Sequence, residues 1–254
     1  MLDERLVTTL HVEALRRRGL HAEHEPHLLF QASTIASLLE GAYDGDITFA
    51  ELAEHGDLGL GTLNRLDGEM IAVDGRFYRA DLDGRMEEID PGARTPFAVV
   101  VFFSPTVDVT IGSAADALEA VERHRPSGAP AFAVRLDGTF ELVRARSVPR
   151  QSPPYRPLAE VAAEQNVFEL ADLSGTLVGF CFPDYARGLE VSGYHFHFID
   201  QDRERGGHVL HCRVRGGRLR IDPSSGWRLE LPPGVELESG HVDGEALDRI
   251  EHST

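Results

Sequence analysis

The sequence contains no lysine, because all 25 basic residues among its 254 are arginine. A lysine amine forms the Schiff base with a carbonyl substrate or with pyridoxal phosphate, and it is also the phosphate-binding residue of the P-loop. These three kinds of site are therefore excluded. If this chain removes a carboxyl group from a keto acid, the electron pair must be taken up by something other than an iminium.

Cysteines and long apolar runs are also scarce. The two cysteines, Cys181 and Cys212, are too few for a disulfide framework, and both lie in apolar, strand-like runs where a buried and unreactive thiol is expected. No run reaches the roughly 18 apolar residues of a membrane-spanning helix, so we expect no membrane partner. Residues 1–19 lack the basic start and apolar middle of a secretory signal, and we therefore expect a cytoplasmic protein.

Positive charge is in deficit over the whole chain. The formal net charge is −17, and no arginine-rich stretch is long enough to form the basic face that a nucleic-acid partner requires. We therefore expect no nucleic-acid partner. With 42% hydrophobic and 26% charged residues, the composition is that of an ordinary globular protein large enough to bury a core.

Asp-Gly pairs separate short apolar runs at 67–68, 74–75 and 83–84, which predicts a β-meander, and the pair at 137–138 predicts another hairpin. Helical spacing predicts short helices at Ser33–Glu40, Thr48–His55, Ser113–His124, Pro157–Gln165 and Asp243–Glu251. Later strands are expected at Phe168–Pro183, Glu190–Asp200, Gly207–Gly217, Arg218–Pro223 and Trp227–Pro232. Because most strands follow one another through tight turns, we expect a strand-dominated α+β fold, with mixed β-sheets in two closely packed halves and a few short helices.

The chain is expected to divide at the proline-rich segment Ser147–Pro157. This gives an N-terminal extension at 1–27, an N-terminal α/β half at 28–148, and a C-terminal β-rich half at 149–254 that carries the histidine-rich hairpin described next.

Two histidines lie two residues apart in the strand-like segment Gly193–Phe198. On a strand, residues two apart point to the same face, so His195 and His197 share a face with their Cα atoms about 6–7 Å apart. That spacing suits two ligands of one metal ion.

A third histidine follows across a polar, turn-like loop. If the two strands pair antiparallel around a symmetric loop, His208 falls opposite His197 and shares its face. In the same register His211 falls opposite Tyr194, on the other face. Three histidines with an open coordination position are typical of catalytic zinc, although iron or manganese would also accept them.

Other interpretations of this pattern stay open at this point. A bare His-x-His occurs by chance, so the chain could be a non-catalytic, metal-binding β protein whose histidines are structural. Cupin-type metal oxygenases and isomerases also carry His-x-His on a strand, but they place a glutamate four or five residues later. Gln201 and Asp202 occupy those positions here, and Glu204 lies farther on.

Several separate stretches, in order, make the sequence resemble the bacterial acetolactate decarboxylase family from about Leu28 to Glu251. They are Leu39–Asp46, His55–Asn64, Leu66–Glu69, Asp74-Gly75, Phe77-Tyr78, Arg146–Pro149, Gly193–Phe198 and Gly207–Leu210. The resemblance implies a zinc enzyme, in the form of a homodimer, that converts 2-acetolactate to acetoin and carbon dioxide.

The same resemblance implies roles for individual residues. His195, His197 and His208 would bind Zn²⁺, Thr62 would lie beside the substrate, and Glu69, Arg146 and Glu251 would be catalytic. Zinc would act as the Lewis-acid electron sink for the enediolate, in place of the iminium that lysine would form. Glu69 or Glu251 would donate the proton, and Arg146 would orient the substrate and stabilise an enediolate oxygen.

Overall fold

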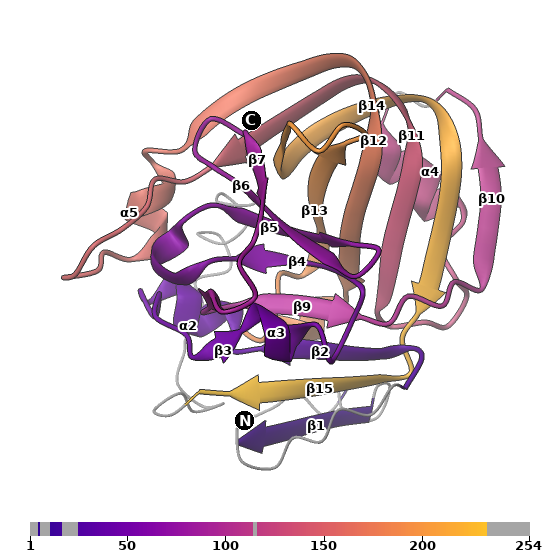
Figure 1. Ribbon diagram of the computed structural model, residues 1–254. Helices are drawn as coiled ribbons and strands as arrows, with labels where there is room; N and C mark the ends of the chain where they lie inside the picture. The colour runs from indigo at the N-terminus through magenta and orange to yellow at the C-terminus, as the bar shows by residue number, and fades with distance from the viewer. Residues whose placement is uncertain (1–4, 6–10, 17–24, 114–115, 233–254) are drawn as a thin grey trace.

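The computed structural model describes residues 5, 11–16, 25–113 and 116–232. Strands dominate this part of the chain, and they form two large sheets and a small ribbon of β3 (Ile47–Thr48) and β8 (Arg94–Thr95). The expected strand-dominated α+β fold is confirmed. Figure 1 shows the long, curved strands of one sheet standing over the shorter strands of the other.

The first sheet has eight strands. In spatial order they are β1 (His11–Arg16), β15 (Gly226–Leu231), β2 (Leu28–Ala32), β9 (Ala98–Val101), β4 (Leu58–Thr62), β5 (Glu69–Val73), β6 (Arg76–Ala80) and β7 (Met86–Glu88). The strands β4 to β7 pair antiparallel in sequence order, as the predicted meander requires. Asp74 and Gly75, which join β5 to β6, both have positive φ (54° and 74°), the conformation of a tight hairpin turn.

The second sheet is closed on itself. It consists of β10 (Val107–Ile111), β14 (Gly206–Pro223), β11 (Phe132–Ser147), β12 (Asn166–Phe182) and β13 (Gly193–Asp200). Because β13 pairs with both β12 and β14, four of these strands form a small barrel, and β10 pairs with the remaining edge of β14. Only three residue pairs close the barrel, and one of them is His197 with His208.

The hairpin predicted at Asp137-Gly138 is wrong, because β11 runs unbroken through both residues. Gly138 lies opposite Gly175 on β12 and opposite Gly217 on β14. A Cβ on Gly138 would lie 2.4 Å from the carbonyl oxygen of Gly216. The glycine therefore permits a close approach of strands instead of a turn.

Asp137 is also explained by its neighbours in the sheet. Its carboxylate accepts a hydrogen bond from the Thr176 hydroxyl at 2.8 Å and forms ion pairs with Arg135 and Arg220. These contacts lower the pKa of Asp137 against the opposing effect of burial. The segments Gly207–Gly217 and Arg218–Pro223, predicted as two strands, likewise form the single strand β14.

The helices are short and lie where the sequence predicts them. They are α2 (Ile35–Leu39), α3 (Phe49–Leu52), α4 (Ala117–Arg123) and α5 (Leu158–Ala162). Thr34 begins α2 by accepting a hydrogen bond from the Ser37 amide, and Thr48 and Glu51 form a reciprocal capping box at α3. Among the described residues, no helix is long and apolar enough to cross a membrane. The helix expected at Asp243–Glu251 lies outside the described residues.

Both sheets contain strands from either side of Ser147–Pro157. The strand β11 precedes this segment yet belongs to the barrel, whereas β15 follows the barrel yet lies between β1 and β2 in the first sheet. The division of the chain at 1–27, 28–148 and 149–254 stays a prediction.

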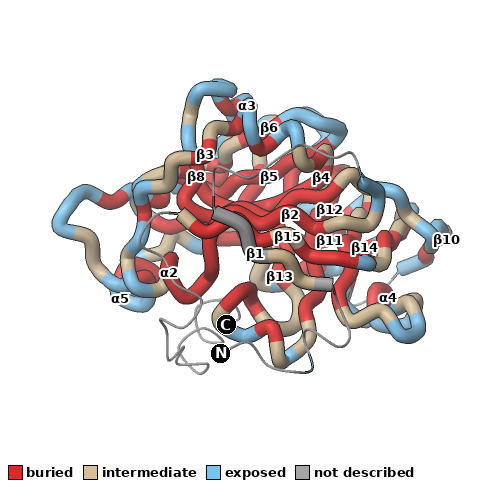
Figure 2. The backbone as a smooth tube through the Cα atoms, turned by 90° about the horizontal axis from the view of Figure 1, so that it is seen from below, coloured by how far each residue is buried: buried red, intermediate tan, exposed pale blue. Residues whose placement is uncertain are grey.

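The main core lies between the two sheets. One apolar cluster joins Val99 and Trp227 of the first sheet to Val178 and Phe180 of the barrel. Figure 2 shows that the central strands are buried, whereas exposed residues gather in loops and at the ends of the molecule. The two sheets are thus packed face to face, and this packing brings β5 next to β13 and β14.

The close approach at Gly138 generates a stability prediction. In Gly138→Ala the new methyl group would meet backbone atoms of β14, and overpacking of this kind costs about 1–3 kcal/mol. We expect the free energy of unfolding in urea to fall by that amount. Gly112→Ala is the matched control, because its Cβ would meet nothing within 4 Å. Equal effects of the two substitutions would contradict the prediction.

Candidate active site

Closure of the barrel brings three histidines together. His195 and His197 lie on β13 and His208 on β14, and all three are buried. Their ring centroids form a nearly equilateral triangle with sides of 5.0, 5.1 and 5.3 Å. The register predicted from the loop is confirmed, because His197 pairs with His208. His211 instead is exposed and lies opposite Arg144 of β11.

The protonation of His197 is set by the first sheet. Its Nδ1 lies 2.8 Å from the carbonyl oxygen of Met70 on β5. A carbonyl can only accept a hydrogen bond, so Nδ1 carries the proton and Nε2 keeps its lone pair. Complete burial, followed by the neighbouring His195, holds the pKa of His197 well below its usual value. The imidazole is therefore neutral at physiological pH, which is the form that binds metals.

The spacing of the ring nitrogens fits a metal ion. His197 Nε2 and His208 Nδ1 are 3.3 Å apart. Two nitrogen ligands of a tetrahedral zinc ion, each bound at about 2.0–2.1 Å, would be separated by about 3.3–3.4 Å. One nitrogen from each of the three histidines lies within 4.8 Å of the others. The three histidines can thus hold one metal ion.

A buried glutamate lies behind the cluster. Glu190, which is 1% exposed, precedes β13, and its Oε1 lies 3.6 Å from His195 Nδ1 while accepting a hydrogen bond from the Val191 amide. A carboxylate beside the outer nitrogen of a ligand histidine orients the ring and increases its basicity. No motif or spacing in the sequence relates Glu190 to the histidines, so its place in the site could not be predicted from the sequence.

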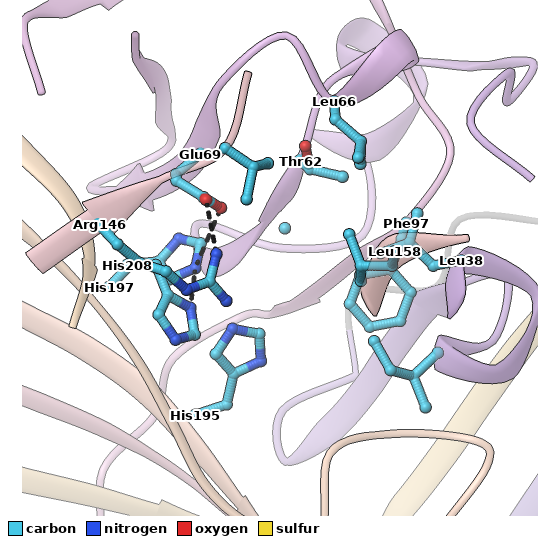
Figure 3. Close-up of a pocket in the computed structure, with 13 residues that line it drawn as sticks. Leu38, Thr62, Leu66, Glu69, Phe97, Arg146, Leu158, His195, His197 and His208 are labelled. Atoms are coloured by element: carbon cyan, nitrogen blue, oxygen red, sulfur yellow. Dashed lines mark hydrogen bonds and ion pairs between the residues drawn. The ribbon is translucent and has the colours of Figure 1, made fainter. Parts of the chain in front are cut away.

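A buried ion pair flanks the histidines. Arg146 on β11 lies opposite His208 in the barrel, and its Nη1 donates to Oε1 of Glu69 on β5 at 3.2 Å. The second oxygen of Glu69, Oε2, is 3.8 Å from His197 Nε2. Figure 3 shows both side chains pointing toward the histidine rings. The predicted grouping of Glu69 and Arg146 with the three histidines is thus present in the structure.

Thr62 lies at the end of β4, directly opposite Glu69. Its hydroxyl donates a hydrogen bond to the carbonyl oxygen of Gly68 at 2.9 Å, and its own carbonyl accepts one from the Thr95 hydroxyl at 2.7 Å. These bonds fix the threonine at the wall of the pocket. Glu251 lies outside the described residues.

One pocket is lined by the three histidines, the ion pair and Thr62, and its volume is about 420 Å³, which includes the part open to solvent. Its apolar lining consists of Ile35, Leu38, Leu66, Phe97, Val148 and Leu158. Figure 3 shows the histidines and the ion pair on one side, with Leu38, Leu66, Phe97 and Leu158 on the other. This apolar lining could not be predicted from the sequence, because leucines that line a pocket follow the same pattern as leucines of the core. The pocket suits a small molecule with polar atoms at one end and alkyl groups at the other.

Comparison with known proteins shows one consistent similarity. The family model described as alpha-acetolactate decarboxylase matches residues 29–242. The alpha-acetolactate decarboxylase of Methylococcus capsulatus is 50% identical over 212 residues, which cover 82% of this chain and 82% of that protein. The alpha-acetolactate decarboxylase of Klebsiella aerogenes is 40% identical over 235 residues, which cover 91% of this chain and 90% of that protein. The crystal structure of alpha-acetolactate decarboxylase from Bacillus subtilis strain 168 superimposes with a TM-score of 0.83 at 37% identity, covering 89% of this chain and all of that one.

The buried pair Arg146–Glu69 generates a prediction about stability. Arg146→Met removes a cation that faces a buried carboxylate, and breaking such a pair costs about 3–5 kcal/mol. The double variant Arg146→Met/Glu69→Leu should lose less than the sum of the two single variants. Urea unfolding of the metal-free proteins measures this coupling energy. The exposed pair Arg76–Glu88 is the control, and its coupling should be much smaller because water screens it. Equal couplings would contradict the prediction.

Proposed function

This chain belongs to the alpha-acetolactate decarboxylase family, and we therefore propose that it converts 2-acetolactate to acetoin and carbon dioxide with one zinc ion held by His195, His197 and His208. The observation that carries this proposal is the pocket in which three buried imidazoles face Arg146 and Glu69. From the same membership we propose that the chain acts as a cytoplasmic homodimer.

The choice of zinc rests on the chemistry of the donor set. Three neutral imidazoles suit zinc, whereas magnesium and calcium prefer oxygen ligands. The reaction requires no change of oxidation state, so a redox-active metal has no advantage. When bound, the ion supplies a Lewis acid to the ketone oxygen of the substrate, which draws away the electron pair that carbon dioxide leaves behind.

Arg146 is suited to orient the anionic substrate. Its guanidinium is planar, always charged and able to bind two oxygens at once. One of its nitrogens is already engaged with Glu69, and this contact fixes the direction of the side chain. An ion pair between Arg146 and the substrate carboxylate that stabilised only the ground state would slow the reaction. We therefore assign Arg146 to orientation and to stabilising the oxygen on which charge develops.

The reaction also needs a proton. The bond between C1 and C2 breaks, carbon dioxide leaves, and C2 must gain one proton to become acetoin. A carboxylic acid within reach of C2 can supply it. We propose Glu69 or Glu251 for this role, because Glu69 lies within the pocket and the resemblance of the sequence to the family implies a catalytic role for Glu251.

Thr62 is suited to position the substrate hydroxyl. Because its own hydroxyl proton is directed at the Gly68 carbonyl, its lone pairs remain able to accept a hydrogen bond from the substrate. The apolar side of the pocket would then receive the methyl groups. Together these contacts would fix a single orientation of the substrate in front of the histidines.

The proposed function predicts metal-dependent formation of acetoin. The purified protein should release acetoin from racemic acetolactate, lose this activity with a chelator and regain it with added zinc. His208→Ala should lose bound zinc and reduce activity by at least about 10²-fold, because it removes a ligand. His211→Ala is the control and should keep both, since His211 is exposed and outside the cluster. Activity that persists in the presence of the chelator would contradict the proposal. Equal zinc content in His208→Ala and His211→Ala would contradict it as well.

The assignment of Glu251 generates a separate prediction. Glu251→Gln keeps the shape of the side chain but removes the transferable proton, so kcat should fall by about 10²-fold or more. The thermal midpoint and the zinc content should change little. Glu245→Gln is a matched control in the same terminal segment. If deletion of Glu251–Thr254 leaves the rate at the wild-type value, the proton must come from Glu69 or from water.

A further inference from the structure

The loop that joins β4 to β5 forms part of the pocket wall. This wall loop, residues 63–68, lies between Thr62 and Glu69, which pair with each other across the two strands. Leu66 from the loop is only 2% exposed and lines the pocket. Figure 3 places Leu66 near Thr62, away from the histidine rings.

The backbone of the wall loop is strained at consecutive positions. Arg65 has a φ of 65° and Leu66 a φ of 54°, both in the left-handed region that side chains with a Cβ seldom occupy. Two such residues in succession persist only where the surroundings over-determine the conformation, and such strain is concentrated at functional sites. The strained backbone therefore indicates that the position of the Leu66 side chain in the pocket wall serves the function of the site.

Hydrogen bonds from two other segments, Tyr43–Gly45 and Gln151, hold the wall loop at Asn64 and Arg65. The Asn64 side chain accepts from the Gly45 amide at 2.9 Å and donates to the Gly45 carbonyl at 2.8 Å. The Arg65 amide donates to the Tyr43 carbonyl and the Arg65 carbonyl accepts from the Gln151 amide, each at 2.7 Å. The loop is thus fixed from both sides at the residue before Leu66.

The far end of the loop is anchored as well. Arg79 donates to the carboxylate of Asp67 at 2.7 Å and to its carbonyl at 2.5 Å. Gly45, which binds Asn64, itself packs closely against the next segment, since a Cβ there would lie 1.8 Å from the Thr95 carbonyl oxygen. Leu66 is therefore a rigid part of the wall.

We propose that Leu66 sets the size of the alkyl group that the substrate carries at C2, and that Asn64 is the positioning residue that holds Leu66 in place. This inference rests on the proposed function. The polar atoms of a 2-hydroxy-3-oxo acid would be held on the histidine side, so its alkyl groups face the apolar side. A substituent longer by one methylene would have to displace Leu66, and the anchored loop resists that displacement. The protein therefore discriminates the C2-methyl substrate from its C2-ethyl homologue.

The test compares kcat/KM for acetolactate and for 2-ethyl-2-hydroxy-3-oxobutanoate. One methylene in an apolar pocket is discriminated by about 10- to 200-fold. Leu66→Ala should raise the ethyl-to-methyl ratio of kcat/KM by at least about 10-fold. Leu52→Ala removes an equally buried leucine from a cluster that does not line the pocket, and it should leave the ratio unchanged.

Asn64→Ala tests the positioning role. It should raise the same ratio and raise KM more than it lowers kcat, because a loosened wall weakens orientation of the substrate. Asn64→Asp keeps an acceptor for the Gly45 amide and should restore part of the wild-type preference. An effect on the thermal midpoint alone, with the ratio unchanged, would show that Asn64 is merely structural and would overturn its assignment.

The outcomes separate this inference from the proposed function. A wild-type protein that acts on neither acid overturns both. A Leu66→Ala variant that is active on acetolactate with the wild-type preference overturns only the role of Leu66. If Leu66→Ala fails to fold, Leu66→Met replaces it, because methionine has a similar volume but is unbranched and adaptable. Leu66→Met should raise the ratio by a smaller factor, and an unchanged ratio there also overturns the role of Leu66.

Discussion

The pairing of β13 with β14 is the constraint on which the rest of the site depends. Three residue pairs close the barrel, and they place His208 beside His197. A slip of one residue would turn His208 to the opposite face and break up the histidine cluster. The same register places Arg146 opposite His208, and the packing of the first sheet against the barrel adds the Met70 carbonyl and Glu69. The site is therefore a consequence of strand pairing and not of a mobile loop.

The cluster of polar groups is costly to bury, and its contacts show how the cost is reduced. Glu69 and Arg146 are almost fully removed from water, yet each faces a group of opposite charge. His197 avoids charge altogether, because burial lowers its pKa. The buried carboxylate of Glu190 lies beside His195, and a metal ion bound by that imidazole would attract it. The protein thus gives each buried charged group of the site a partner of opposite charge or a hydrogen-bond donor.

Local sequence patterns predicted elements well where the local chain decides the structure. Asp74-Gly75 forms a turn because both residues adopt positive φ, and the symmetric loop after Asp200 identified His208 over His211. Asp137-Gly138 has the same two residue types but lies within a strand. Gly138 lies opposite a glycine on each of the two neighbouring strands, and these strands approach it too closely for a side chain. That requirement is set by β12 and β14, which are distant in sequence. Glu190 and the apolar wall escaped prediction for the same reason.

The position of β15 has a consequence for how the chain acquires its shape. This last described strand pairs with β2, so His27 and Asp222, which lie 195 residues apart in sequence, come into contact beside it. During synthesis β2 can pair with β9 early. Its other edge can pair with β15 only after almost the whole chain has been synthesised. Contacts so distant in sequence are slow to form. Fragments cut at the proline-rich segment would each lack strands of both sheets, so the protein is expected to fold as a single cooperative unit.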